Sequence, residues 1–313
     1  MSDIQYFVFA TISMSIPIVL TTLGGVFAER ARITNIGMEG LMLISSFVSM
    51  AIAAHLNNPW IGMFFGIISS MLFALILALV IFKFNCNSII AGIGVNLLAS
   101  GITWLLLEYI YNEPGAYAPS GIDTLPKIRW EFLKTLPFIG DIIYNQSVVL
   151  VITVVLIIAG FIVMRYTQFG YWVRAVGQNE DATRAVGIDP IKIKIATLLI
   201  SGFTAGIAGA FLSTSSMVVF AINMTAGRGF IALGSTIFGA GTVIGSVLAA
   251  LLFGAAEAAS VRLQTLTIPV QFVLMLPYVA TIIALTISSV TKRLRTKQDN
   301  SYETFVPSIT IQR

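Results

Sequence analysis

The sequence predicts an all-α fold, a polytopic transmembrane helical bundle with about 7–9 spanning helices and a possible re-entrant pair. Composition is the first observation: 57% of the residues are hydrophobic and 10% are charged, whereas soluble domains carry about 25% charged residues. The second is a set of long stretches without Asp, Glu, Lys or Arg, such as 40–82 and 195–227. A spanning helix needs about 20 apolar residues. These stretches are continuously apolar, as in 149–164, and lack the alternation of barrel strands.

The apolar segments divide the chain into one transmembrane domain, 1–291, and a cytoplasmic tail, 292–313. Two long polar loops interrupt the domain, an external loop at 111–146 and a cytoplasmic loop at 166–193. The pair 229–243 and 246–260 is short for full crossings. It either forms a hairpin that enters and leaves from the outer face, beside seven full crossings, or crosses twice, which gives nine. The expected helices cover 5–27, 36–54, 60–82, 87–110, 147–165, 194–215, 229–243, 246–260 and 268–290.

Basic residues predict the orientation, because Lys and Arg collect in cytoplasmic loops. With the N-terminus outside and the C-terminus in the cytoplasm, 13 of the 18 basic residues lie inside. The reverse orientation inverts that ratio. The five basic residues outside or near the outer face are then Lys127, Arg129, Lys134, Arg228 and Arg262.

Motifs for catalysis and for metal binding are missing from the sequence. The dipeptide Gly-Lys of a phosphate-binding loop never occurs, so no ATP site of that type is expected. One His and one Cys cannot form an ordinary zinc site. We therefore predict no enzyme activity of its own, no catalytic residue, no metal and no cofactor. The pI near 9.2 reflects membrane topology rather than nucleic-acid binding.

The cytoplasmic loop contains signals for a short capped helix. Asn179 is a suitable N-cap, Glu180 and Asp181 complement the dipole of the first turn, and Gly187 can end the helix. Asp189-Pro190 then offers a cap and a first residue for the next helix. A two-turn helix is marginal in water, so it must dock on something. The alternative is a plain turn, although helix connections usually take only 2–8 residues.

Three segments resemble permeases of ABC importers in the branched-chain amino acid, ribose and nucleoside group. FGYWVRAVGQNEDATRAVGID, from Phe169, is similar to the segment that couples such permeases to their ATPase. GGVFAERARITNIGMEGLML (24–43) is similar to the signature of the simple-sugar and nucleoside subfamily, as is the late segment GRGFIALGSTIFGAGTVIGSVLAALLFGAAEA (227–258). Gly241-Thr242-Val243 departs from the family, in which a polar residue and Pro are common.

The resemblance implies a bacterial cell-membrane subunit that imports a small polar solute, with nucleosides as the leading substrate class. Its implied partners are a second similar permease, an ABC ATPase with two nucleotide-binding modules, an external substrate-binding (lipo)protein, and membrane lipids. A simple sugar is the alternative substrate, and an ion-coupled secondary transporter is the alternative class. The residues assigned to ATPase coupling are Arg174, Asn179, Glu180, Asp181 and Arg184.

Polar residues inside the spanning segments are candidates for the substrate pathway, because intramembrane charges face protein or water. Asn35 and Glu39 are expected on one face of the second helix, at i and i+4, and Asn96 lies in the middle of the fourth. Alternatively, Glu39 binds Arg30 or Arg32 or stabilises a broken helix, and Asn96 bonds a neighbouring helix. A structural ion pair is expected between Glu257 and Arg262.

Small residues four apart allow helices to pack closely. Such spacings occur at Gly62/Gly66, Gly202/Gly206 and Gly241/Gly245. We interpret all three as packing positions rather than sites.

Overall fold

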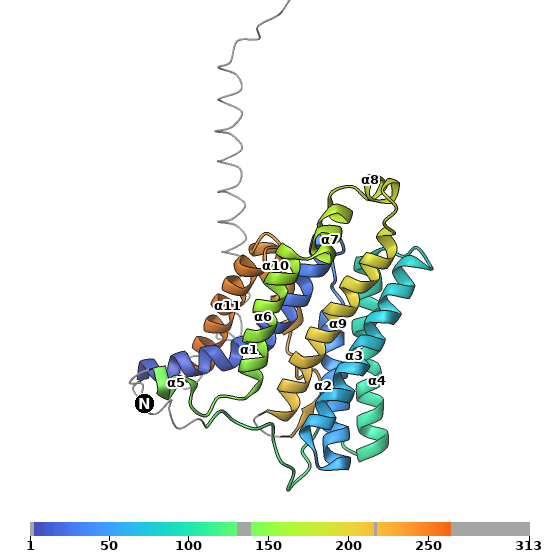
Figure 1. Ribbon diagram of the computed structural model, residues 1–313. Coiled ribbons are helices and arrows are strands. Elements are labelled where there is room, and N and C mark those ends of the chain that lie inside the picture. The colour runs from blue at the N-terminus through green and yellow to red at the C-terminus, as the bar shows by residue number, and fades with distance from the viewer. Residues whose placement is uncertain (1–2, 130–138, 216–217, 264–313) are drawn as a thin grey trace, which may run out of the picture.

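The computed structural model describes residues 3–129, 139–215 and 218–263, which form an almost entirely helical bundle (Figure 1). The expected segment 268–290 and the tail lie outside these residues. The elements are α1 (Asp3–Arg30), α2 (Met38–Leu56), α3 (Pro59–Phe82), α4 (Ser88–Tyr111), β1 (Ala116–Tyr117), α5 (Ile139–Ile143), α6 (Val149–Tyr166), α7 (Gln168–Gln178), α8 (Glu180–Ala185), α9 (Pro190–Thr214), β2 (Phe220–Ala221), α10 (Arg228–Phe238) and α11 (Val243–Leu263).

Helices α1, α2 and α9 form the centre of the bundle. Helix α9 packs against α1, α2 and α3, and α11 runs along α1 on the other side. Within the apolar window of α9, 67% of the residues are buried, against 22% for α6 and 28% for α4. Because lipid is as apolar as these side chains, the outer helices can leave most of their surface uncovered. The described residues include seven helices long and apolar enough to cross a membrane.

Asparagine and aspartate side chains set several helix boundaries. Asn57 ends α2 in the left-handed conformation (φ 47°), and Asn58 caps α3 by accepting bonds from the amides of Trp60 and Ile61. Asn87 caps α4 in the same way. These side chains satisfy amides that have no partner inside the helix. The expected boundaries of α3 and α4 are confirmed within about two residues.

Close glycine contacts join α3 to its two neighbours. A Cβ on Gly66 would lie 1.9 Å from the Ser49 Oγ, and one on Gly206 would lie 2.8 Å from the Ile67 Cα. The packing role expected for Gly62/Gly66 and Gly202/Gly206 is therefore confirmed. For Gly241/Gly245 the prediction is confirmed only in part: a Cβ on Gly245 would lie 2.8 Å from the Gly239 carbonyl oxygen, but Gly241 lies in the turn between α10 and α11 with φ +62°.

The α10–α11 pair is asymmetric, unlike the expected hairpin of two short helices. Helix α10 has 11 residues, but α11 has 21 and is long enough to span. The chain leaves α9, pairs β2 with β1 in an antiparallel ribbon, and then starts α10 beside the first turn of α2. Helix α10 is thus a half-length helix inside the bundle.

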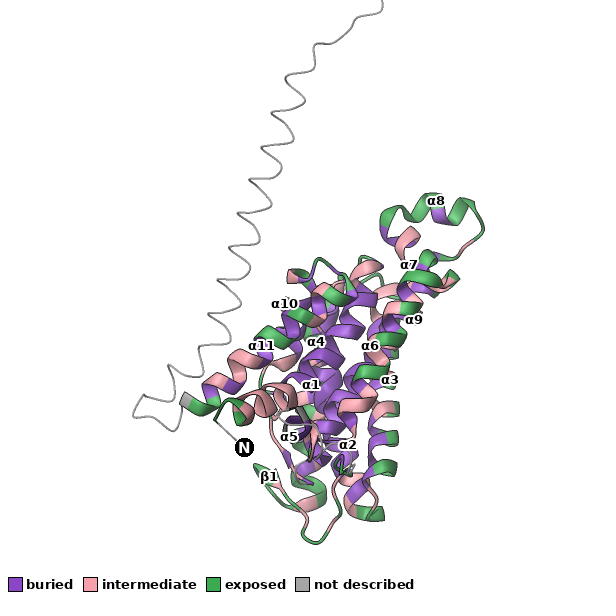
Figure 2. Cartoon of the chain, turned by 60° about the vertical axis from the view of Figure 1, so that its left-hand side comes forward, coloured by how far each residue is buried: buried purple, intermediate pink, exposed green. Residues whose placement is uncertain are grey.

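The two ends of the bundle differ in construction (Figure 2). At one end, here called the α8 end, α7 and α8 project beyond the spanning helices. The β1–β2 ribbon lies at the opposite end, where Tyr111 stacks on Tyr117 with ring centroids 4.0 Å apart.

Candidate functional site

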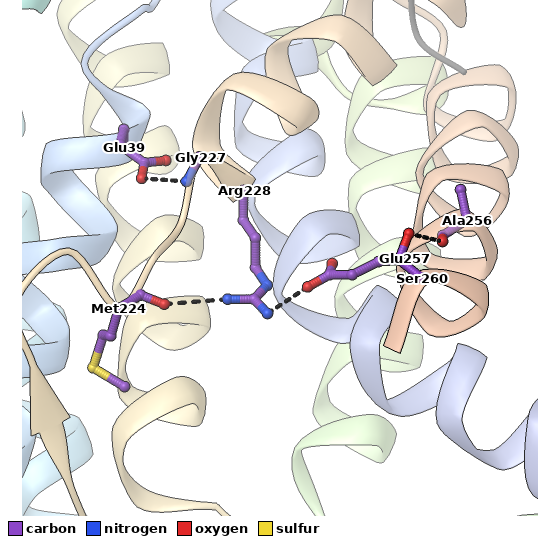
Figure 3. A network of polar contacts seen from close by, with 7 residues as sticks. All are labelled: Glu39, Met224, Gly227, Arg228, Ala256, Glu257 and Ser260. Carbon is purple, nitrogen blue, oxygen red and sulfur yellow. Dashed lines mark hydrogen bonds and ion pairs between the residues drawn. The ribbon is translucent and has the colours of Figure 1, made fainter. Parts of the chain in front are cut away.

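Glu39 links the first turn of α2 to the first turn of α10 (Figure 3). Its Oε1 accepts hydrogen bonds from the Thr225 hydroxyl at 2.6 Å and the Gly227 amide at 2.9 Å. Its Oε2 accepts one from the Gly229 amide at 2.7 Å. These bonds join residues 186 to 190 positions apart. We call Glu39, Thr225, Gly227 and Gly229 the Glu39 knot.

The knot places one carboxylate between two helix N-termini. Each N-terminus carries partial positive charge and amides without a helical partner, so both favour an anion at this point. Gly227 permits the approach because its φ of +81° suits glycine. Gly229 permits contact, since a Cβ there would lie 2.5 Å from the Glu39 amide nitrogen. The Gly-Arg-Gly sequence at 227–229 is the local signal that could have indicated this role.

Arg228 forms an ion pair with Glu257, and its Nη1 also donates to the Met224 carbonyl at 3.2 Å (Figure 3). Glu257 lies about 9 Å along the axis of α11 from its end. Arg228 therefore reaches α11 from the first turn of α10, and its side chain is largely covered by the bundle. The Arg228 Nε and the Glu257 Oε2 are buried and have no partner among the described residues.

The ion pair expected between Glu257 and Arg262 is wrong. Arg262 instead binds the Asp3 carboxylate at 2.8 Å, which ties the end of α11 to the start of α1. The error has a physical reason: Arg228 is far away in sequence, but the half-length α10 brings it to α11 at the depth of Glu257.

Asn35 and Glu39 do not share a helix face, because Asn35 precedes α2. The helix was expected to start at 36, but its first residue is Met38, and 33–35 are non-helical. Asn35 is buried and donates to the Ser201 hydroxyl on α9 at 2.9 Å. Its Oδ1 has no partner within the described part of the chain.

Asn96 joins α4 to the same region. Its Nδ2 donates to the Ile36 carbonyl at 3.0 Å, and its Oδ1 accepts from the Gly40 amide at 2.8 Å. The interpretation that Asn96 bonds a neighbouring helix is confirmed. Asn35 thus ties the non-helical entry of α2 to α9, Glu39 ties the first turn of α2 to α10, and Asn96 of α4 bonds both.

The short capped helix expected at the α8 end is present. The Asn179 Oδ1 accepts from the Ala182 amide at 3.0 Å, and α8 ends before Gly187, which has φ +84°. Asp189 caps α9 by accepting from the Ile191 amide. Helix α7 was not expected.

Helices α7 and α8 together form the projection, and α7 packs against the bundle. Its buried residues are Gly170, Val173, Val176 and Gly177, a spacing that places them on one face. Gly177 touches the end of α1, since a Cβ there would lie 1.9 Å from the Arg30 carbonyl oxygen. The Nε of Arg30 in turn donates to the Gly241 carbonyl at 2.6 Å, in the α10–α11 turn. Contacts thus run continuously from α7 through Arg30 to α10.

The charged residues assigned to coupling occupy different positions. Glu180 is paired with Lys194 of α9. Arg174 folds back to the Met164 carbonyl, with its guanidinium 4.6 Å from the Tyr171 ring centroid. Asp181 and Arg184 are exposed.

Val186 was missed by the sequence analysis. It follows α8 directly and is 73% exposed. Its apolar side chain is therefore available at the tip of the projection.

Comparisons with known proteins find similarity along most of the chain. Residues 7–285 match the family described as "Branched-chain amino acid transport system / permease component". The guanosine ABC transporter permease protein NupQ of Bacillus subtilis is 32% identical, across 88% of this chain and 90% of its own. The nucleoside ABC transporter permease protein NupC of Lactococcus lactis is 32% identical, across 91% and 92%.

A putative glucose ABC transporter permease, TsgC13 of Haloferax volcanii, is 26% identical across 83% of this chain and 78% of its own. No solved structure matches the chain. The family match covers nearly the whole described bundle, including α8 and the Glu39 knot. The chain belongs to the family of branched-chain amino acid transport system permease components, as a transmembrane permease of the ABC transporter type.

Proposed function

We propose that this chain is a pore-forming subunit of an ABC importer that carries nucleosides into the cell. The observation that carries the substrate class is the pair of relatives at 32% identity, one named for guanosine and one for nucleosides. The permease named for glucose matches at lower identity and coverage.

Uptake by cells with and without this gene tests the substrate class. Tritiated guanosine, adenosine, uridine and glucose are supplied separately, and each rate is compared with that of the deletion strain. We expect the deletion to lower nucleoside uptake and plasmid-borne wild type to restore it. Loss of glucose uptake alone would favour the sugar alternative.

Uptake that continues after ATP depletion but stops when the ion gradient collapses would favour the secondary transporter. The coupling projection would then have no purpose. The predicted partners are a second similar permease, an ATPase with two nucleotide-binding modules and an external binding protein. Copurification of the ATPase with this chain is expected.

For coupling, we propose that α8 docks in a cleft of the ATPase. Asp181, Arg184 and Val186 are exposed at its tip, while Asn179 and Glu180 hold the helix in shape. Motion of α8 reaches the bundle through α7, which rests on Arg30, and Arg30 holds the α10–α11 turn. Arg174 bonds α7 to α6, so it helps to hold α8 in place through α7.

Substitution of the tip tests this docking. Asp181→Lys together with Val186→Asp should abolish copurification of the ATPase or its nucleoside-stimulated hydrolysis, because an unpaired charge is placed in the contact. Lys192→Gln is the matched control, since Lys192 is exposed nearby and outside α8. Unchanged binding and unchanged stimulated hydrolysis in the double variant would remove α8 from the mechanism.

We propose the orientation that places α8 in the cytoplasm, with the N-terminus outside. It is supported by the basic residues of 165–194 at the α8 end. After replacement of Cys86, a cysteine at Asp181 should react in intact cells only with membrane-permeant reagents. Labelling by an impermeant reagent would show that the proposed orientation is wrong and that α8 lies outside the cell.

The assignment of Asn35, Glu39 and Asn96 to the substrate pathway stays a prediction. Among the side-chain oxygens of these three residues, only the Asn35 Oδ1 has no hydrogen-bond partner among the described residues. Of the three residues, Asn35 is thus the one whose substitution should change the nucleoside KM. Asn35→Asp keeps an acceptor at this position, whereas Asn35→Ala removes it.

A further inference from the structure

Two adjoining cavities open at the α8 end, between α1, α6, α7 and the α10–α11 turn. Their volumes are about 340 and 710 Å³, and both are lined by Arg30, Arg174 and Gly241. Arg32 lines the smaller cavity, and Arg165 lines the larger one. Together they form a single region at the ends of α1 and α6.

The region is strongly cationic. Four arginines line it against one carboxylate, Glu29. Within residues 3–129, 139–215 and 218–263, the ion pairs are formed by other basic residues. A guanidinium has five N–H donors in a planar fork that matches phosphate oxygens. Such a cluster favours binding of an anion with several acceptor oxygens.

Two of the guanidiniums are held in place by backbone contacts. The Arg30 Nε donates to the Gly241 carbonyl, and the Arg174 Nη1 donates to the Met164 carbonyl. Each bond uses one donor of five, so donors remain for a ligand. Because these side chains are already ordered, little further conformational entropy is lost when they bind one.

The larger cavity also has an apolar wall that continues into the spanning region. Phe161 of α6 and Ile244 of α11 line it. Ile244 is 57% exposed, and Leu248 one turn further along α11 is 61% exposed. Tyr166 and Tyr171 also line this cavity, and Tyr side chains are enriched at the membrane–water interface. The cationic part therefore lies at a helix end and the apolar part extends along the membrane-facing helices.

We propose that this region binds an anionic phospholipid, with its phosphate on the arginines and an acyl chain along Ile244 and Leu248. A free phosphate matches the charges but makes no use of the apolar wall. A neutral phospholipid carries a choline or ethanolamine cation that the four arginines repel. Basic pockets between spanning helices are known binding sites for anionic headgroups. The lipid would thereby join α6 to the turn that Arg30 contacts, next to the seat of α7.

Native mass spectrometry of the full-length chain tests this proposal. The purified, delipidated protein is titrated with phosphatidylglycerol and, separately, with phosphatidylcholine of the same acyl chains. The test variant is Arg32→Gln/Arg165→Gln, which removes one charge from each cavity. The matched control is Lys83→Gln/Lys192→Gln, which removes the same charge from two exposed positions outside the cavities.

We expect wild type and control to retain at least one phosphatidylglycerol and to bind it at least about fivefold more tightly than phosphatidylcholine. The test variant should lose that preference while keeping the same melting temperature without lipid. Equal binding of the two lipids by wild type, or an unchanged preference in the test variant, would overturn the proposal. If inorganic phosphate displaced the bound phosphatidylglycerol and stabilised wild type as strongly as the lipid does, the site would belong to a free anion and the lipid assignment would be wrong.

Discussion

The Glu39 knot and the α7–α8 projection are built on opposite principles. In the knot, both carboxylate oxygens are used by partners within the chain. In the projection, the local bonds only cap and seat the helices, and Asp181, Arg184 and Val186 remain exposed. Polar groups inside the bundle therefore mainly fix an irregular backbone, whereas polar groups outside it remain available for a partner.

The largest effect is expected for the Arg228–Glu257 pair beside the knot. Glu257→Leu leaves the Arg228 guanidinium without its carboxylate. The two side chains are 20% and 15% exposed, so the cost approaches the figure of about 3–5 kcal/mol for breaking a fully buried pair. We expect a large loss of folded protein, measured as membrane level and as melting temperature in detergent.

The double variant Arg228→Met/Glu257→Leu separates charge from packing. An ion pair replaced by apolar residues of similar volume is often neutral, so the double variant should recover most of the lost stability. A double variant as unstable as Glu257→Leu would show that the pair itself is not what holds α10 to α11.

Glu39→Gln tests the knot directly. The amide retains one acceptor but points its NH₂ group at a peptide N–H, so charge-assisted hydrogen bonds of about 1.5–3 kcal/mol are lost. Protein level and uptake should fall together, while the exposed control Glu108→Gln should behave as wild type. Normal protein level with abolished uptake would place Glu39 in the substrate pathway instead.

The sequence predicted helices α1 to α4, α6 and α9, the caps of α8 and α9 and the exposure of the projection, because these depend on residues within a few positions of each other. It did not predict α7 or the unequal lengths of α10 and α11. It did not predict the partners of Glu39 or Glu257. Those partners lie up to 190 residues away, and they meet only because the chain enters the bundle without a helix at 33–37 and at 222–227. Asn35 shows the same limit: its expected helix face does not exist.

Gly177→Ala tests the contact between α7 and the end of α1, which connects the projection to the bundle. A Cβ at this position collides with the Arg30 carbonyl oxygen, and overpacking typically costs about 1–3 kcal/mol. We expect normal membrane insertion but weaker coupling, seen as a lower ratio of uptake to ATP hydrolyzed. Gly94→Ala is the control, because its Cβ would meet nothing within 4 Å. Unimpaired coupling in Gly177→Ala would contradict the proposal that motion of α8 is transmitted through Arg30.

Asn179→Ala should have the smallest effect on stability. Loss of an N-cap costs about 1 kcal/mol, and α8 lies outside the bundle. The melting temperature of the permease should stay within error of wild type, while copurified ATPase decreases. Asn179→Asp, which preserves the cap, should restore it. A failure of Asn179→Asp to restore copurification would mean that the amide contacts the ATPase itself.

Hydrogen exchange of the permease in nanodiscs, with and without its ATPase, tests the contrast between the two regions most directly. Peptides covering 180–186 should exchange rapidly in the permease alone and become protected when the ATPase is bound. Peptides covering 222–230 should be protected in both states, because the Glu39 knot is complete within the chain. Equal exchange at 180–186 in the two states, or protection at 222–230 only when the ATPase is bound, would contradict the account.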